Sequence, residues 1–265
     1  MLHWIFAVFA AVGTAVCYIA APALSPWLIL PLWGGFAVAA AVLYVVFLVV
    51  VSLLLPRRGE RYLPFCVAII RHTVEWVLPL LGIRVRLDGW DKLPEAPFLL
   101  VGNHLTLLDP LVTVARLGKT RRVTFVSKPE NLRLPVVGAI ARNTAFLAID
   151  REHPRKAVET IHRAADFIRN EKMCVGIYPE GTRNKSDQLL LPFRDGAFKI
   201  AMLAACPIAV VTTRFLPRRW LLGARQMELS VIGVLEADFV AAHRTAEISG
   251  TVRTMMEEKL RQNGG

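Results

Sequence analysis

Hydrophobic and polar positions divide this chain into two unequal parts. The first 55 residues contain no Lys, Arg, Asp or Glu, and their two apolar runs, residues 4–20 and about 33–55, are each long enough to cross most or all of a hydrocarbon core. Five helix-breaking residues separate these runs or interrupt the start of the second: Pro22, Pro26, Pro31, Gly34 and Gly35. We therefore predict an N-terminal membrane hairpin of two helices over residues 1–55.

Two other arrangements fit the same pattern. A cleaved signal peptide would begin with a basic segment, and only Met1 to Trp4 stand at that place. A hairpin that enters one leaflet without spanning the bilayer fits equally well. Three arginines, Arg57, Arg58 and Arg61, follow the second apolar run at once. Because positive charges stay on the inner side of a membrane, we expect the C-terminal part to lie at the cytoplasmic face.

Beyond residue 56 the apolar runs become short and alternate in type. Residues 56–82 contain a helix that either lies at the membrane interface, links the anchor to the rest or packs on it. The strand-like runs are 83–88, 98–102, 122–127, 145–149, 173–178, 207–213 and 228–235, and helices fit 110–117, 135–142, 154–170, 195–205 and 245–261. Such alternation predicts an α/β fold, with a mixed central sheet covered by helices, in one domain over residues 83–265.

Charge and cysteine usage narrow the class of protein. The net charge of +11 lies entirely beyond residue 55, and no zinc finger, helix-turn-helix or aromatic strand pattern indicates nucleic acid as the partner. An anionic membrane surface suits such a charge beside an apolar anchor. The four cysteines show no metal-binding spacing, so we predict no metal site and small buried apolar roles for Cys17, Cys66, Cys174 and Cys206.

A histidine and an aspartate directly follow the strand-like run 98–102. His104 and Asp109 are five residues apart, and an imidazole held by a carboxylate can take a proton from a hydroxyl near neutral pH. Residues five apart do not face each other on a regular helix, so the pair can meet only through a turn. Pro110 favours one, because the residue before proline avoids the helical region. The alternatives are a helix N-cap for Asp109 and a hydrogen-bonded core histidine for His104.

Three further strand-like runs are each followed by a cationic side chain. Arg183 ends a turn that Gly181 makes flexible, and Lys128 and Arg151 directly follow two other runs. Guanidinium binds phosphate through two parallel hydrogen bonds. Three strand exits that each carry a cation therefore predict an anion pocket, and the alternative for Arg183 is a surface ion pair with a carboxylate such as Asp187.

Four sequence motifs occur in a fixed order. They are Asn-His-x4-Asp at 103–109, Phe-Leu-Ala-Ile-Asp-Arg at 146–151, Pro-Glu-Gly-Thr-Arg at 179–183, and a Pro-Ile pair at 207–208 that opens a strand. Together they resemble the glycerolipid acyltransferases, and most closely the bacterial 1-acyl-glycerol-3-phosphate acyltransferases. The resemblance covers about residues 83–215. Thr106 and Arg194 stand where this family often has Ser and Lys, and both exchanges keep the chemistry of the side chain.

The resemblance implies a role for each matching residue. His104 would be the general base that deprotonates the acceptor hydroxyl, and Asp109 would orient and stabilise its imidazolium. The strand that opens at Pro207 would help to shape the acyl site. The acceptor phosphate would be held by residues of two motifs, with Lys128 as support: Arg151, Glu180, Gly181, Thr182 and Arg183.

The implied reaction is acyl transfer to a membrane lipid. An acyl group would pass from acyl-CoA or acyl carrier protein to the free hydroxyl, expected at position 2, of 1-acyl-glycerol-3-phosphate, which forms phosphatidic acid in phospholipid biosynthesis. Neither an acyl-enzyme nor a cofactor beyond the thioester co-substrate is expected. Three alternatives stay open: acylation of another lyso-lipid, such as a lyso-aminolipid or a lysophospholipid with a head group; acyl transfer to water; and a non-catalytic membrane protein that keeps the fold.

Overall fold

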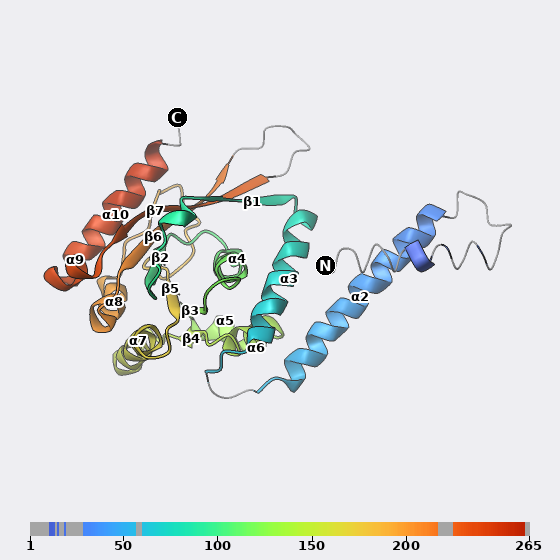
Figure 1. Cartoon of the computed structure of the whole chain (residues 1–265), viewed down its shortest axis with the longest axis horizontal. Helices are drawn as coiled ribbons and strands as arrows, with labels where there is room; N and C mark the ends of the chain where they lie inside the picture. The colour runs from blue at the N-terminus through green and yellow to red at the C-terminus, as the bar shows by residue number, and fades with distance from the viewer. Residues whose placement is uncertain are drawn as a thin grey trace.

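A seven-stranded mixed sheet forms the centre of the protein (Figure 1). The computed structural model describes residues 11–13, 15, 19, 29–56, 60–216 and 225–262. Its strands lie in the order β1-β7-β6-β2-β5-β3-β4. Their bounds are β1 (Ile83–Asp88), β2 (Leu99–Gly102), β3 (Val123–Ser127), β4 (Leu147–Ala148), β5 (Cys174–Ile177), β6 (Ile208–Leu216) and β7 (Arg225–Leu235). The predicted α/β fold with a mixed sheet is confirmed.

Strand direction decides where the loops of the sheet meet. The strands β2 to β6 run parallel to one another, whereas β7 pairs antiparallel with β6 and parallel with β1. The carboxyl ends of β2, β3, β4, β5 and β6 therefore lie along one edge of the sheet. The loops that follow these strands contain the predicted site residues, so the topology gathers them at that edge.

The strand predicted at 145–149 is shorter than expected. Only Leu147 and Ala148 pair with β3. Ala145 has a φ of 60°, in the left-handed region, and its N–H donates to the carbonyl of Arg61 at 2.8 Å. The chain is therefore still turning at this residue, and the ladder begins two residues later.

Helices cover both faces of the sheet (Figure 1). They are α3 (Pro64–Leu80), α4 (Leu108–Leu117), α5 (Pro129–Arg133), α6 (Val137–Arg142), α7 (Pro154–Arg169), α8 (Lys199–Ala204), α9 (Ala237–Ala242) and α10 (Thr245–Gln262), with 3-10 turns η2 (Trp90–Lys92) and η3 (Asp195–Phe198). The helix predicted at 195–205 is divided into η3 and α8. Neither α5 nor α9 was predicted, because elements of five and six residues are too short to show a helical period.

Two hydrophobic cores follow from the alternation of side chains along β2. Leu99 and Val101 point into a core formed with α7, α8 and α10, whereas Phe98 and Leu100 point into a core formed with α3, α4 and α6. All four side chains are buried, as expected of a strand covered on both faces. Six side chains of α3 are buried in the second core, so this helix packs on the domain.

The helix α2 (Ile29–Leu54) precedes this body (Figure 1). Within the described residues, its segment Gly34–Leu54 is the one helix that is long and apolar enough to cross a membrane. Its C-terminal part contacts the domain, because Leu48 and Val51 pack against the second core and the hydroxyl of Tyr44 lies 2.9 Å from that of Thr73 on α3. Most of the first predicted membrane run, residues 4–20, lies outside the described residues, so the two-helix hairpin stays a prediction.

Candidate active site

The chain that leaves β2 is fixed by a buried asparagine. The side-chain nitrogen of Asn103 donates to the carbonyl of Thr213 at 2.9 Å, and its side-chain oxygen accepts the N–H of the same residue at 2.7 Å. Thr213 belongs to the neighbouring strand β6. Asn103 thus continues the ladder with its side chain while its own backbone turns away, which directs the next residue, His104, out of the sheet.

His104 and Asp109 form a hydrogen-bonded pair. Nδ1 of His104 lies 2.9 Å from Oδ2 of Asp109, whose side chain is almost fully buried. The same oxygen accepts the backbone N–H groups of Leu105 at 2.7 Å and Thr106 at 2.8 Å, and Oδ1 accepts the hydroxyl of Thr106 at 2.6 Å. The N-cap of α4 is Leu107, so Asp109 lies within the helix and binds the loop before it. The predicted turn brings the pair together.

Aromatic rings support one face of the imidazole. The ring of Tyr178, at the end of β5, stacks on His104 with centroids 4.3 Å apart and planes 7° from parallel. Phe125 of β3 stacks in turn on Tyr178 at 5.5 Å. The imidazole is therefore held at its Nδ1 edge and on one face. Sequence reasoning missed Tyr178, since a tyrosine at a strand end carries no local signal of what it will contact.

Glu180 takes a different position from the one predicted. We expected it to bind the substrate together with its turn, but it is 5% exposed and does not line the cavity described below. Its Oε1 accepts the backbone N–H of His104 at 2.8 Å, and its Oε2 accepts that of Leu191 at 2.9 Å. Both oxygens are thus engaged by the backbone in this structure, and binding of the substrate by Glu180 stays a prediction.

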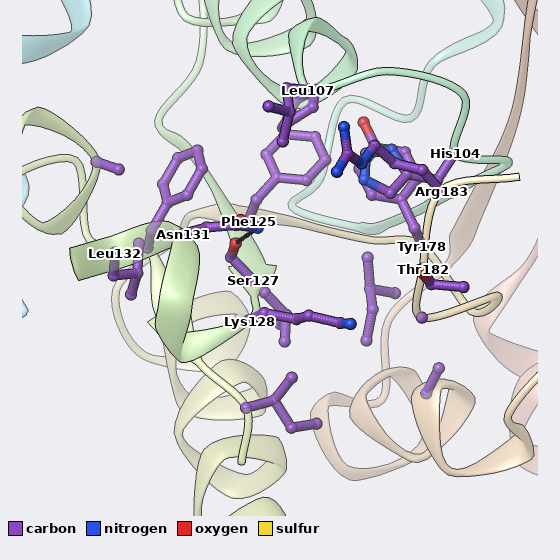
Figure 2. A pocket seen from close by; sticks show the side chains of 18 of the residues that line it. His104, Leu107, Phe125, Ser127, Lys128, Asn131, Leu132, Tyr178, Thr182 and Arg183 are labelled. Carbon is purple, nitrogen blue, oxygen red and sulfur yellow. Dashed lines mark hydrogen bonds between the residues drawn. The ribbon is translucent and has the colours of Figure 1, made fainter. Parts of the chain in front are cut away.

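Four cations line the space in front of the His104–Asp109 pair: Lys128, Arg151, Arg183 and Arg194. Figure 2 shows Lys128 extending from the side of α5 toward the turn that carries Thr182, and Arg183 beside His104. A guanidinium nitrogen of Arg151 donates to the carbonyl of Gly181. Sequence analysis noted the charge of Arg194 without placing it in the site; its position next to the predicted turn follows from the hydrogen bond of its N–H to the carbonyl of Pro179 at 2.9 Å.

These groups surround a cavity of about 550 Å³. None of its described lining residues is Asp or Glu. Its polar lining includes His104, the four cations, Gly181 and Thr182. Six of the eight predicted site residues therefore line the cavity, and the other two, Asp109 and Glu180, stand behind its wall. Much of the remaining lining is apolar and comes from α4, β3, α5, α6 and the residues that flank them, including Leu107, Leu111, Phe125, Leu132, Leu134, Val137 and Phe146.

Electrostatics favour an anion in this cavity. Burial lowers the pKa of Arg151, and the neighbouring charge of Arg194 lowers it further. An anion between the two guanidinium groups would relieve their repulsion and replace lost solvation. No group of three or more His, Cys, Asp or Glu that could hold a metal ion occurs among the described residues.

The described cysteines are buried, as predicted, and do not line the cavity. Burial raises the pKa of Cys66 to about 11 and that of Cys206 to about 12, and it also raises the pKa of Cys174. Cys17 lies outside the described residues. The three buried thiols therefore stay protonated and inert near neutral pH.

Known proteins resemble this chain over the region of the site. It is 28% identical over 224 residues to the 1-acyl-sn-glycerol-3-phosphate acyltransferase of Escherichia coli, covering 83% of this chain and 88% of that protein. It is 23% identical over 211 residues to the Saccharomyces cerevisiae protein of the same name, covering 73% and 68%. A lysophospholipid acyltransferase of Xenopus tropicalis is 36% identical over 124 residues, which cover 46% of this chain and 22% of that protein.

A solved structure shares the fold, and a family model covers the site. The crystal structure of the 1-acyl-sn-glycerophosphate acyltransferase of Thermotoga maritima matches with a TM-score of 0.60 at 18% identity, covering 83% of this chain and 88% of that one. The family model described as acyltransferase matches residues 84–214. Every residue that lines the cavity falls within this segment, which runs from β1 to β6. The chain therefore belongs to the acyltransferase family and is an O-acyltransferase.

Proposed function

We propose that this enzyme transfers an acyl group from a thioester to the position-2 hydroxyl of 1-acyl-glycerol-3-phosphate, which forms phosphatidic acid. The observation that carries the proposal is the lining of the cavity, which brings the imidazole of His104 together with four cations and many apolar side chains, while Asp109 holds the imidazole from behind the wall. A lysophosphatidic acid has the matching order of groups: a phosphate, a free hydroxyl and an acyl chain. Relatives that bear this activity in their names align over most of the chain.

The base in the proposed reaction is Nε2 of His104. Asp109 receives four hydrogen-bond donors on its two oxygens, so it acts as a carboxylate and accepts the proton of Nδ1. This leaves Nε2 with the free lone pair. Nε2 takes the proton of the acceptor hydroxyl as its oxygen attacks the thioester carbonyl carbon, and Asp109 stabilises the imidazolium that forms. General-base help of this kind contributes about 10²–10⁴-fold to the rate.

The second step needs no further protein nucleophile. The tetrahedral intermediate collapses, the carbon–sulfur bond breaks, and the imidazolium gives its proton to the leaving thiolate. The products are phosphatidic acid and the free thiol of the donor, and His104 returns to its starting state. Acyl-CoA and acyl carrier protein both deliver the acyl group as a thioester, so either serves as co-substrate, and the reaction as written uses no other cofactor.

The cations orient the acceptor in this proposal. Arg183, Lys128 and Arg151 would bind its phosphate together with the turn at Gly181 and Thr182. A phosphate fixed at one point brings the hydroxyl to the base, and such orientation can supply a large part of the rate. Arg194 would add a fourth positive charge to this subsite.

We further propose that α2 anchors the enzyme in a membrane with the catalytic domain on the cytoplasmic face. Support comes from the apolar segment Gly34–Leu54 and from the arginines that follow it in the sequence, Arg57, Arg58 and Arg61. The acceptor lipid would reach the cavity from this membrane, whose anionic surface attracts the basic domain.

A second candidate function, acylation of a lysophospholipid with a head group, also has an observation in its favour. This chain is 36% identical over 124 residues to a lysophospholipid acyltransferase of Xenopus tropicalis. An acceptor with a larger head group would use the same base and a smaller share of the phosphate contacts. Competition between lysophosphatidic acid and a lysophospholipid in one assay separates the two candidates.

The test is formation of phosphatidic acid by the purified protein in liposomes. Wild type and His104→Ala are assayed with lysophosphatidic acid as acceptor and with each thioester donor. We expect product from wild type with at least one donor, and a loss of about 10²–10⁴-fold for His104→Ala. Folded wild-type protein that acylates only another lyso-lipid would overturn the acceptor assignment, and release of free fatty acid without an acceptor would indicate a hydrolase.

A further inference from the structure

The buried carboxylate of Glu180 joins two loops of the site. Glu180 follows β5, whereas the N–H groups that it accepts belong to His104, which follows β2, and to Leu191, farther along the loop that leads from β5 to η3. Each of its oxygens takes one of these N–H groups, at 2.8 and 2.9 Å. Hydrogen bonds to a charged group are among the stronger ones in proteins, so the two loops are held in one arrangement.

The peptide groups of His104 are held from both sides by the same turn. Its N–H donates to Glu180, and its carbonyl accepts the N–H of Asn184 at 2.7 Å. Arg183 lies between these two residues in the sequence. The backbone of the base is therefore tied to the segment that carries the proposed phosphate ligand, independently of the contact between its side chain and Asp109.

We infer that Glu180 is a positioning residue that sets the imidazole of His104 relative to the phosphate-binding turn. This inference rests on the proposed function and deepens it, since it gives Glu180 a role other than that of a substrate ligand. Movement of the His104 backbone by a fraction of an ångström would shift Nε2 relative to a hydroxyl whose place is set by Arg183. The carboxylate of Glu180 thus determines whether the base His104 and the phosphate ligand Arg183 can act on the same acceptor molecule at once.

The surroundings of Glu180 agree with this role. A second anion at the cavity wall would repel a phosphate, but the side chain points away from the cavity and is buried. Burial raises the pKa of Glu180, while the N–H groups of Leu191 and His104 and the charge of Arg253 oppose this rise. Arg253 also donates to the carbonyl of Leu191 at 2.9 Å, so it fixes the residue whose N–H donates to Glu180.

The experiment compares Glu180→Gln with wild type in the liposome assay. A glutamine keeps the shape but accepts with one oxygen only, and its NH2 group meets one of the two N–H donors. We expect kcat to fall by about 10²-fold, as for a small displacement of a catalytic group, and KM for lysophosphatidic acid to change by no more than about twofold. A large rise in KM with kcat retained would show that Glu180 binds the acceptor and would overturn the inference.

Glu228→Gln is the matched control. Glu228 is also a buried carboxylate, 4% exposed, but it lies on β7 and pairs with Arg86 of β1 and Arg214 of β6. Its substitution should lower the melting temperature and leave kcat and KM of the folded protein unchanged. Equal loss of kcat in both variants would mean that any buried carboxylate has this effect, and it would overturn a specific role for Glu180.

Hydrogen exchange supplies a readout that does not depend on the substrate. In Glu180→Gln, and not in Glu228→Gln, the amides of residues 103–109 should exchange faster, because the N–H of His104 loses its acceptor. If wild type proves inactive on lysophosphatidic acid, the proposed function fails while this prediction can still hold. Unchanged exchange at residues 103–109, in protein that melts as wild type does, would overturn the inference itself.

Discussion

The guanidinium of Arg151 occupies the place where a side chain of residue 181 would begin. A Cβ atom built on Gly181 would lie 2.6 Å from Nη1 of Arg151, and Gly181 has a φ of 71°. The same guanidinium donates to the carbonyl of Gly181. The glycine of the Glu-Gly-Thr-Arg turn is therefore required twice, by its backbone conformation and by the arginine packed on it.

Gly181→Ala should weaken binding of the acceptor. The added methyl group displaces Arg151, and the left-handed conformation costs about 1–2 kcal/mol for an alanine. We expect KM for lysophosphatidic acid to rise by about tenfold and the melting temperature to fall. Gly196→Ala is the control, because a Cβ on this cavity-lining glycine meets nothing within 4 Å. Equal kinetics for the two variants would contradict the explanation.

Asp109→Asn should remove activity and leave the acceptor bound. The amide cannot accept the four donors that surround the carboxylate, and it no longer fixes the proton of His104 on Nδ1. We expect kcat to fall by about 10²–10⁴-fold with little change in KM. Steady-state kinetics on protein of verified circular dichroism tests this, with Asp187→Asn in an exposed loop as the control. A variant that kept more than a tenth of wild-type kcat would exclude the proposed role of Asp109.

Arg183→Gln and Arg194→Gln should each raise KM for lysophosphatidic acid. Loss of a charge-assisted hydrogen bond to phosphate costs about 1.5–3 kcal/mol, which corresponds to a rise of about 10- to 150-fold. At saturating acceptor, kcat should recover substantially. Lys185→Gln removes a charge from the same loop outside the cavity and should leave KM near the wild-type value. If all three variants respond alike, the effect is one of general surface charge, and the two arginines form no phosphate subsite.

Thiol reactivity should report on the fold and not on the active site. With a pKa of about 12, Cys206 is ionised in only about one molecule in ten thousand at pH 8. Burial raises the pKa of Cys66 and Cys206 above 9.0 in the native state. As the pH rises above about 9, the unfolded chain therefore loses these protons before the native protein does, and the free energy of unfolding falls until the pH passes the native pKa values. Iodoacetamide at pH 8 should leave the peptides of both residues unmodified until denaturant is added. Rapid labelling in the native protein, together with loss of activity, would contradict their burial.

Much of the fold could be predicted because its elements have local causes. The strand over residues 83–88 has the predicted bounds, and the helix at 154–170 ends within a residue of them. Strict alternation or a helical period is visible in each of these segments. The errors occur where local pattern is weak: the two-residue strand β4 and the short helices α5 and α9.

The candidate site was predicted in part for the same reason. His104, Asp109 and Arg183 belong to motifs whose order and spacing are read directly from the chain. The residues that were missed or misplaced act through distant partners. Tyr178 is identified by its stacking on His104, and Glu180 by its hydrogen bond to a residue 76 positions away.

The sequence by itself determined the alternation of strands and helices, the apolar N-terminal region and the chemical types gathered in the motifs, because each depends on residues close together along the chain. Only the tertiary structure decided the strand order, the reversed direction of β7 and the side on which each motif residue contacts its neighbours. The physical reason is that a buried carboxylate binds whichever N–H groups the fold brings to it. For Glu180 these belong to His104 and Leu191, and no spacing in the sequence encodes that meeting.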